Sequence, residues 1–215
     1  MWAGARPAWF PEEFLWVVGA SYRGLPQHVA PVRNPIGANM AFRRAAFVAA
    51  GPFTDGLGRI GRIPLGCEET KFSTRVRRAV PGAEVLYVPA AEVMHHVACD
   101  RGTWRYFASR CWAEGLSTAI VARLVGRGDG LSSERSYVTR TLPHGMAAGI
   151  AAAAHGDVSG LGRAAALTAG VAITTPVYLK GRLTARQSGS HRSPRRVTGE
   201  ESGPESGPLP TAVRS

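Results

Sequence analysis

Two adjacent carboxylates, Glu68 and Glu69, follow a glycine-rich stretch at residues 51–66 and open a predicted helix over residues 68–79. A carboxylate in the first turn of a helix meets free backbone N–H groups, which hold it in place. There it can accept a proton from a hydroxyl group in an adjoining pocket. Two acids at a helix start are also an ordinary complement to the helix dipole, so the pair alone leaves both roles open.

Further motifs surround this acidic pair in a defined order. Residues 37–44 read Gly-Ala-Asn-Met-Ala-Phe-Arg-Arg, residues 51–53 read Gly-Pro-Phe, and residues 66–70 read Gly-Cys-Glu-Glu-Thr. Val88-Pro89 then precedes His95-His96, and residues 104–115 read Trp-Arg-Tyr-Phe-Ala-Ser-Arg-Cys-Trp-Ala-Glu-Gly. In this order the motifs resemble the second half of family-2 glycosyltransferases of the GT-A type, from near residue 10 to residue 183.

The resemblance implies a role for each matching residue. In these enzymes the second acid of the loop-to-helix turn is the catalytic base, which assigns that role to Glu69 and a supporting role to Glu68. Lys71 stands where many relatives carry another acid, and this departure bears on the acceptor contacts. The implied substrate-binding residues are Gly37, Asn39, Arg75 and Trp104.

His95 and His96 lie in a segment, residues 92–97, that is predicted to be a strand. By itself a histidine at a strand end usually has a structural role. In the GT-A family a histidine in this region can complete the site of the divalent metal, Mn²⁺ or Mg²⁺, that neutralises the donor diphosphate. Strand neighbours point to opposite faces, so only one of the two faces such a site, and we assign the metal to His96. Cys99 also suggests zinc, but the ligands are too few.

The donor-binding features of the family have no counterpart in the sequence. The aspartates Asp55, Asp100, Asp129 and Asp157 form no Asp-x-Asp, and no glycine-rich phosphate loop precedes a helix. We therefore expect the acceptor side of the active site without the nucleotide-binding half, in a chain whose Met1 is not the start of a complete domain.

The implied reaction is transfer of a sugar from a nucleotide-diphosphate donor to a hydroxyl acceptor with inversion, and Glu69 is the base. Alone, the chain is expected to have negligible transferase activity. The alternative function is a catalytically incompetent remnant or a partner subunit, in which case a separate chain supplies the donor half.

The expected fold class is α/β. Predicted strands cover residues 14–18, 36–42, 84–88 and 92–97, and predicted helices cover residues 43–50, 68–79 and 103–125. Gly51 is predicted to end the first helix, and Thr103 is a predicted N-cap. The Ala-rich residues 146–183 read as two helices split near His155.

The resemblance gives a partial GT-A (Rossmann-like) sheet fragment followed by C-terminal helices and a disordered tail. Residues 1–125 are the expected C-terminal half of the GT-A domain, and residues 126–145 are a connection. Residues 146–183 are a helical appendage. Residues 184–215, rich in Ser, Gly, Pro and charge, are the tail.

Charge and cysteine content limit the class of partner. The net charge of +11 permits anionic lipid or phosphorylated sugars as partners, but only Lys71 and Lys180 of the 26 basic residues are lysine. No nucleic-acid-binding motif is present, so we expect no nucleic-acid partner. The three cysteines form no C-x-x-C pair, which suits a reducing cytosol.

The expected location is cytoplasmic, with attachment to the inner face of the plasma membrane as an open alternative. Residues 1–14 lack the pattern of a secretory signal. Residues 164–179 carry no charge but are shorter than the roughly 20 residues that span a bilayer, and so favour a packed or membrane-surface helix. The expected partners are a nucleotide-sugar donor, a glycan or lipid-linked acceptor, and a membrane surface.

Overall fold

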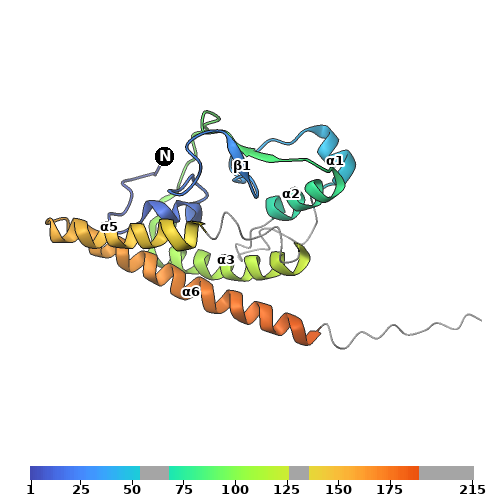
Figure 1. Cartoon of the computed structure of the whole chain (residues 1–215). Coiled ribbons are helices and arrows are strands. Elements are labelled where there is room, and N and C mark those ends of the chain that lie inside the picture. Colours follow the sequence, from blue (N-terminus) through green and yellow to red (C-terminus); the bar gives the residue numbers. More distant parts are fainter. Residues whose placement is uncertain (54–67, 126–135, 189–215) are drawn as a thin grey trace, which may run out of the picture.

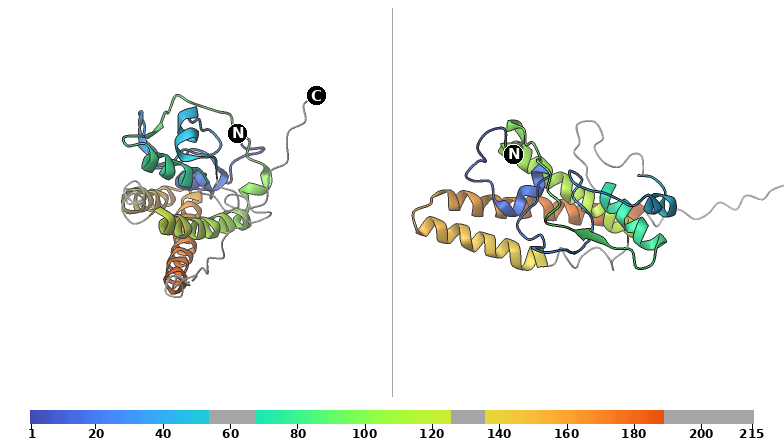
Figure 2. Two further views of the ribbon diagram at one scale, coloured as in Figure 1. Left: turned by 90° about the vertical axis from the view of Figure 1, so that its right-hand side faces the viewer. Right: turned by 90° about the horizontal axis from the view of Figure 1, so that it is seen from above.

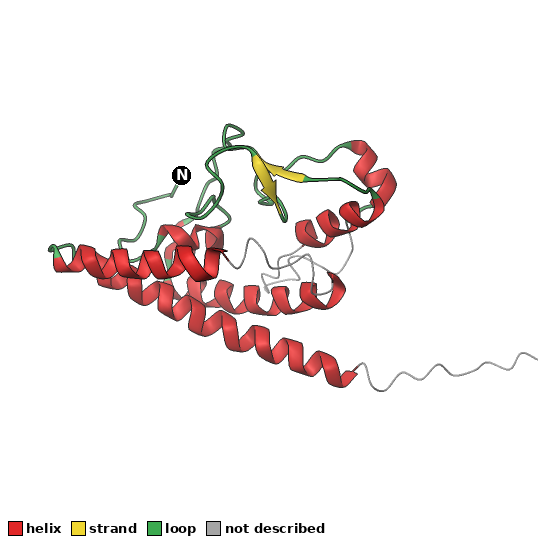
Figure 3. Ribbon diagram, viewed as in Figure 1, coloured by secondary structure: helices red, strands yellow, loops and turns green. Residues whose placement is uncertain are grey.

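The computed structural model describes residues 1–53, 68–125 and 136–188. These residues are mainly helical, with a small sheet of two strands (Figure 3). Residues 126–135 of the predicted connection and residues 189–215 of the predicted tail lie outside the described residues. The rest of both segments is helical where an element is assigned, since residues 137–145 belong to η3 and α5 and residues 184–188 continue α6. In chain order the elements are η1 (Glu12–Val18), β1 (Ala30–Val32), α1 (Arg44–Ala50), α2 (Glu68–Ala79), β2 (Val85–Tyr87), η2 (Cys99–Gly102), α3 (Trp104–Val125), η3 (Tyr137–Thr141), α5 (Leu142–Ala154) and α6 (Ser159–Ser188).

Helix α3 runs through the middle of the molecule. The sheet and helices α1 and α2 lie on one side of it, and α6 lies on the other side (Figures 1 and 2). Strands β1 and β2 pair antiparallel, with Ala30 opposite Tyr87 and Val32 opposite Val85. Helices α5 and α6 form a hairpin, and α6 packs along both α5 and α3.

Several helices agree with the prediction because their signals are local. Helix α2 covers residues 68–79 as expected, and α3 begins directly after Thr103. The Thr103 hydroxyl accepts a hydrogen bond from the Tyr106 backbone N–H at 3.3 Å, which confirms the N-cap. Gly51 ends α1 with a φ of 72°, a conformation that favours glycine.

Three predicted strands are wrong. Residues 12–18 form the 3₁₀ helix η1, in which Phe14, Val17 and Val18 are buried at helical spacing. Residues 36–42 contain only a turn, closed by a bridge between Ile36 and Asn39. Residues 92–97 form no strand, and the one β-bridge in this segment pairs Val97 with Trp2. None of these three segments pairs with a strand over its length, and a segment without such a partner cannot join a sheet.

The expected α/β class holds only in a coarse sense. In the described part of the chain the sheet has two antiparallel strands, so the predicted Rossmann-like GT-A sheet is not found there. A parallel sheet of that kind needs several strands joined by helical crossovers. Strand β1 was not predicted, because residues 20–35 are rich in Pro, Gly and Arg and read as a loop.

One hydrophobic core joins the N-terminal segment to the helical hairpin. Phe10 and Phe14 pack against Phe107 of α3, with ring centroids 5.5 and 5.4 Å apart, and the same cluster includes Leu142 and Leu167. Each such side chain contributes about 1.5–3 kcal/mol when buried. The helices predicted as an appendage therefore share the core of residues 1–125.

Candidate active site

Glu69 lies in the first turn of α2 and is partly buried. Its Oε1 lies directly against Gly37: a Cβ added at that glycine would be only 2.4 Å from Oε1. The two residues are far apart in the chain, so the turn at residues 36–39 and the start of α2 meet only in the folded protein. The carboxylate is therefore held where position 37 leaves room for it.

The Gly37 turn is fixed from two sides. The Asn39 backbone N–H donates to the Ile36 carbonyl at 2.9 Å, which closes the turn. The Asn39 side-chain amide donates to the Ala91 carbonyl at 2.5 Å, which ties the turn to the segment after β2. Asn39 thus supports the backbone beside Glu69, and its side chain is already engaged within the chain.

The environment of Glu69 favours its protonated form. Burial raises the pKa of its carboxyl above the ordinary value, and the neighbouring carboxylates Glu68 and Glu114 act in the same direction. Its own backbone N–H and the Arg110 guanidinium oppose this shift. A carboxylate with a raised pKa is a stronger base, which is the property that general-base catalysis requires.

Helix α3 contacts α2, and the charges of Arg110 and Glu114 on α3 act on the Glu69 carboxyl. They are one helical turn apart, so they share one face of α3. Tyr22 lies beside the same group: burial raises the pKa of its hydroxyl, Glu114 and Tyr87 add to the rise, and Arg33 opposes it. Sequence reasoning assigned no role to Arg110, Glu114 or Tyr22, although the i, i+4 spacing of the first two could have indicated a shared face.

Arg75 is used within the fold. Its Nη2 donates to the Pro52 carbonyl, and its guanidinium lies 5.6 Å from the centre of the Phe72 ring. Its buried Nε has no hydrogen-bond partner in the structure. These contacts hold the segment after α1 against α2, so Arg75 has a structural role beside the site.

Trp104 belongs to a different cluster. Its ring stacks on Phe107 at 5.2 Å and meets the Trp9 ring edge-on at 5.6 Å. It is 49% exposed at the start of α3. Glu114 stands ten residues further along the helix, about 15 Å away along its axis. The fold therefore brings Gly37 to Glu69 and its neighbour Glu68, whereas Trp104 lies apart from this group.

The two histidines face opposite ways. His95 points inward, with its Nε2 2.9 Å from the Val18 carbonyl oxygen, whereas His96 is exposed. In residues 1–53, 68–125 and 136–188, no three His, Cys, Asp or Glu side chains gather as a group that could hold a metal ion. The residues described do not fit the expected divalent metal, so no step is assigned to one. Cys67 and Asp55 lie outside the described residues.

Comparison with known proteins gives one relevant similarity. Over 120 residues the chain is 31% identical to a protein of Haloferax volcanii named glucosyl-dolichyl phosphate glucuronosyltransferase. The match covers 56% of this chain but only 38% of the relative, so the chain spans well under half of that protein's length.

Two other comparisons gave no match: no protein-family model and no solved structure resembles the chain significantly. Within the described ranges, no helix combines the length and the apolar character needed to cross a bilayer.

Proposed function

We propose that this chain supplies the acceptor side of a glycosyltransferase active site, with Glu69 as the catalytic base. The observation that carries the proposal is the placement of Glu69: a partly buried carboxylate in the first turn of α2, against Gly37, with a raised pKa. The similarity to a protein named as a glucuronosyltransferase supports the same reaction class.

The reaction is an in-line displacement at the anomeric carbon. Glu69 takes the proton of the acceptor hydroxyl while that oxygen forms a bond to the anomeric carbon of the donor sugar. The bond from that carbon to the diphosphate breaks, and the diphosphate leaves with the electron pair. A single displacement inverts the configuration. Arg110 and Glu114 act on Glu69 through their charge, in opposite directions.

The relative's name supports the proposed acceptor class. We propose a lipid-linked sugar as acceptor, since the relative is named for a glucosyl-dolichyl phosphate substrate. The proposed donor, a nucleoside-diphosphate sugar, is the one that the resemblance to family-2 glycosyltransferases implies. Because the chain spans 38% of that relative, we assign the acceptor to this chain and the donor to a further segment or partner chain.

The test uses the native protein, purified from its source with an antibody against residues 184–215, so that any further segment or partner is retained. A panel of radiolabelled nucleotide sugars is incubated with a short-chain glucosyl-polyprenyl phosphate, and label in the organic phase is counted. We expect transfer that Glu69→Gln lowers about 10³-fold or more while acceptor binding stays within a few-fold.

The isolated chain of 215 residues separates this proposal from the alternative of a remnant or partner subunit. We expect it to bind the acceptor but to turn over no donor. Acceptor binding without transfer by the native protein would favour the remnant. Transfer that survives Glu69→Gln would remove Glu69 from its role.

A further inference from the structure

The outward face of α6 carries almost no charge. Between Ser159 and Leu183 the exposed residues recur at intervals of three, four and seven, which places them on one side of the helix. They are Leu161, Ala165, Thr168, Ala172, Thr175, Pro176, Leu179, Lys180 and Leu183. We call the uncharged members of this set the α6 stripe. From Leu161 to Leu183 the stripe is about 33 Å long.

The stripe is exposed and contains large apolar side chains. Leu161, Leu179 and Leu183 are 57%, 51% and 63% exposed. The stripe also contains two threonines, Thr168 and Thr175. The Thr168 hydroxyl donates to the Ala164 carbonyl at 3.0 Å and so is satisfied by the helix itself. A continuous apolar surface of this length marks a contact with another molecule or a membrane.

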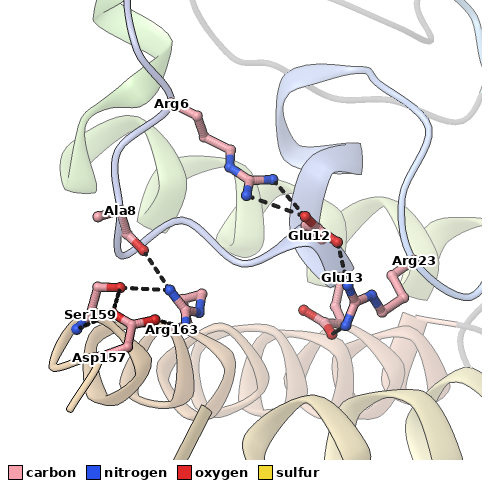
Figure 4. A network of polar contacts seen from close by, with 8 residues as sticks. All are labelled: Arg6, Ala8, Glu12, Glu13, Arg23, Asp157, Ser159 and Arg163. Atoms are coloured by element: carbon pink, nitrogen blue, oxygen red, sulfur yellow. Dashed lines mark hydrogen bonds and ion pairs between the residues drawn. The ribbon is translucent and has the colours of Figure 1, made fainter. Parts of the chain in front are cut away.

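Charges near the stripe are neutralised or stand at its end. Asp157 and Arg163 pair with each other at 2.7 Å beside the α5–α6 turn (Figure 4). Arg163 also donates to the Ser159 hydroxyl at 2.6 Å, and it reaches the Ala8 carbonyl at 3.5 Å, so its guanidinium turns toward the N-terminal segment. Helix α5 adds no charge: its exposed residues are Pro143, His144, Ala147, Ala148, Ile150, Ala151 and Ala154.

The inner face of α6 is fully used by the fold. Ala164, Ala166 and Leu167 are buried in the core, and Gly160 packs so closely on α5 that a Cβ there would lie 2.2 Å from the Gly149 carbonyl oxygen. The stripe is therefore a second apolar face on a helix whose first face is already buried in the core.

We propose that the α6 stripe binds a lipid surface, with α6 lying in the plane of an anionic bilayer. Lys180 is the exposed cation on this face, where a long basic side chain reaches the headgroups while the helix stays in the acyl boundary. The net charge of +11 favours anionic lipid. Helix α2 lies across α3 from α6, so the start of α2 would not be buried in the bilayer (Figure 1).

This inference is independent of the proposed reaction and is tested without donor or acceptor. The whole chain is mixed with phosphatidylcholine vesicles, with or without phosphatidylglycerol, and binding is measured by flotation. The double variant Ala172→Glu/Leu179→Glu places two carboxylates on the stripe. We expect it to lose vesicle affinity by about tenfold or more, because ionised groups are costly in the acyl boundary.

The matched control is Ala45→Glu/Val48→Glu, which adds the same charge to exposed positions of α1. This control should lower affinity for anionic vesicles only modestly, because its two added charges lie away from the stripe. Lys180→Glu should weaken binding to anionic vesicles by a few-fold, an effect that added salt removes. Glu69→Gln should leave vesicle binding unchanged even if the proposed reaction is wrong.

Two results would overturn the inference. The first is vesicle binding of the stripe variant equal to that of the α1 control, with both folded by circular dichroism. The second is a chain that does not float with vesicles but forms a dimer in light scattering, which the stripe variant dissociates. The stripe would then be an interface between two copies of the chain.

Discussion

Gly37→Ala tests whether the position of the Glu69 carboxylate matters for transfer. The new Cβ would stand 2.4 Å from Oε1, about 1 Å short of the 3.4 Å at which ordinary van der Waals contact begins. The carboxylate, at the end of a flexible side chain, has to retreat by that amount. A misplacement of about 1 Å at a reacting group can lower the rate about 10²-fold, or about 2.7 kcal/mol in the barrier.

The assay is transfer by the native protein, and acceptor binding and stability are measured on the same variant. We expect kcat to fall about 10²-fold while KM for the acceptor changes little. Stability should change by less than about 1 kcal/mol, because Gly37 is exposed and does not have a left-handed φ. Gly4→Ala is the matched control, since nothing lies within 4 Å of the Cβ it would add.

Glu69→Asp supplies the second arm. It withdraws the carboxylate by one methylene, so Gly37→Ala should cost little more in that background, and the two effects should be clearly non-additive. The acid limb of the pH–rate profile should also move to lower pH in Gly37→Ala, because a carboxylate pushed toward solvent loses part of its raised pKa. Wild-type activity in Gly37→Ala, or strict additivity with Glu69→Asp, would refute the assigned contact.

Three further predictions concern the chain alone. Glu69→Gln should raise the free energy of unfolding in urea at pH values above the raised pKa of Glu69, and should leave it unchanged in acid, where the Glu69 carboxyl is protonated in both the folded and the unfolded chain. Equal effects at both pH values would contradict the burial of an ionised carboxylate. Burial raises the pKa of the Cys111 thiol to about 12, so at mild alkaline pH exposed Cys99 should be alkylated by iodoacetamide much faster, as peptide mass spectrometry would show. Leu167→Ala should lower the unfolding free energy by about 2–5 kcal/mol in a single transition; a separate early transition of the hairpin would mean that it does not share the core.

The parts of the fold that could be predicted from the sequence are those whose signals are local. The acidic first turn of α2, the Thr103 cap of α3 and Gly51 after α1 each act within a few residues, and all three were predicted. The break between α5 and α6 near His155 was predicted for the same reason. The acidic pair of the candidate site was found because it stands at one of these helix starts.

Features that depend on residues distant in the chain could not be predicted. Residues 14–18 and 92–97 were both predicted to be strands, but the first forms part of the helix η1 and the second pairs with another segment only in the bridge between Val97 and Trp2. No periodicity in the chain predicts the contact between Gly37 and Glu69, the effect of the Glu114 charge on Glu69, or the inward turn of His95 in place of His96. Local signals act through hydrogen bonds within one turn, whereas these contacts exist only after packing has brought separate elements together.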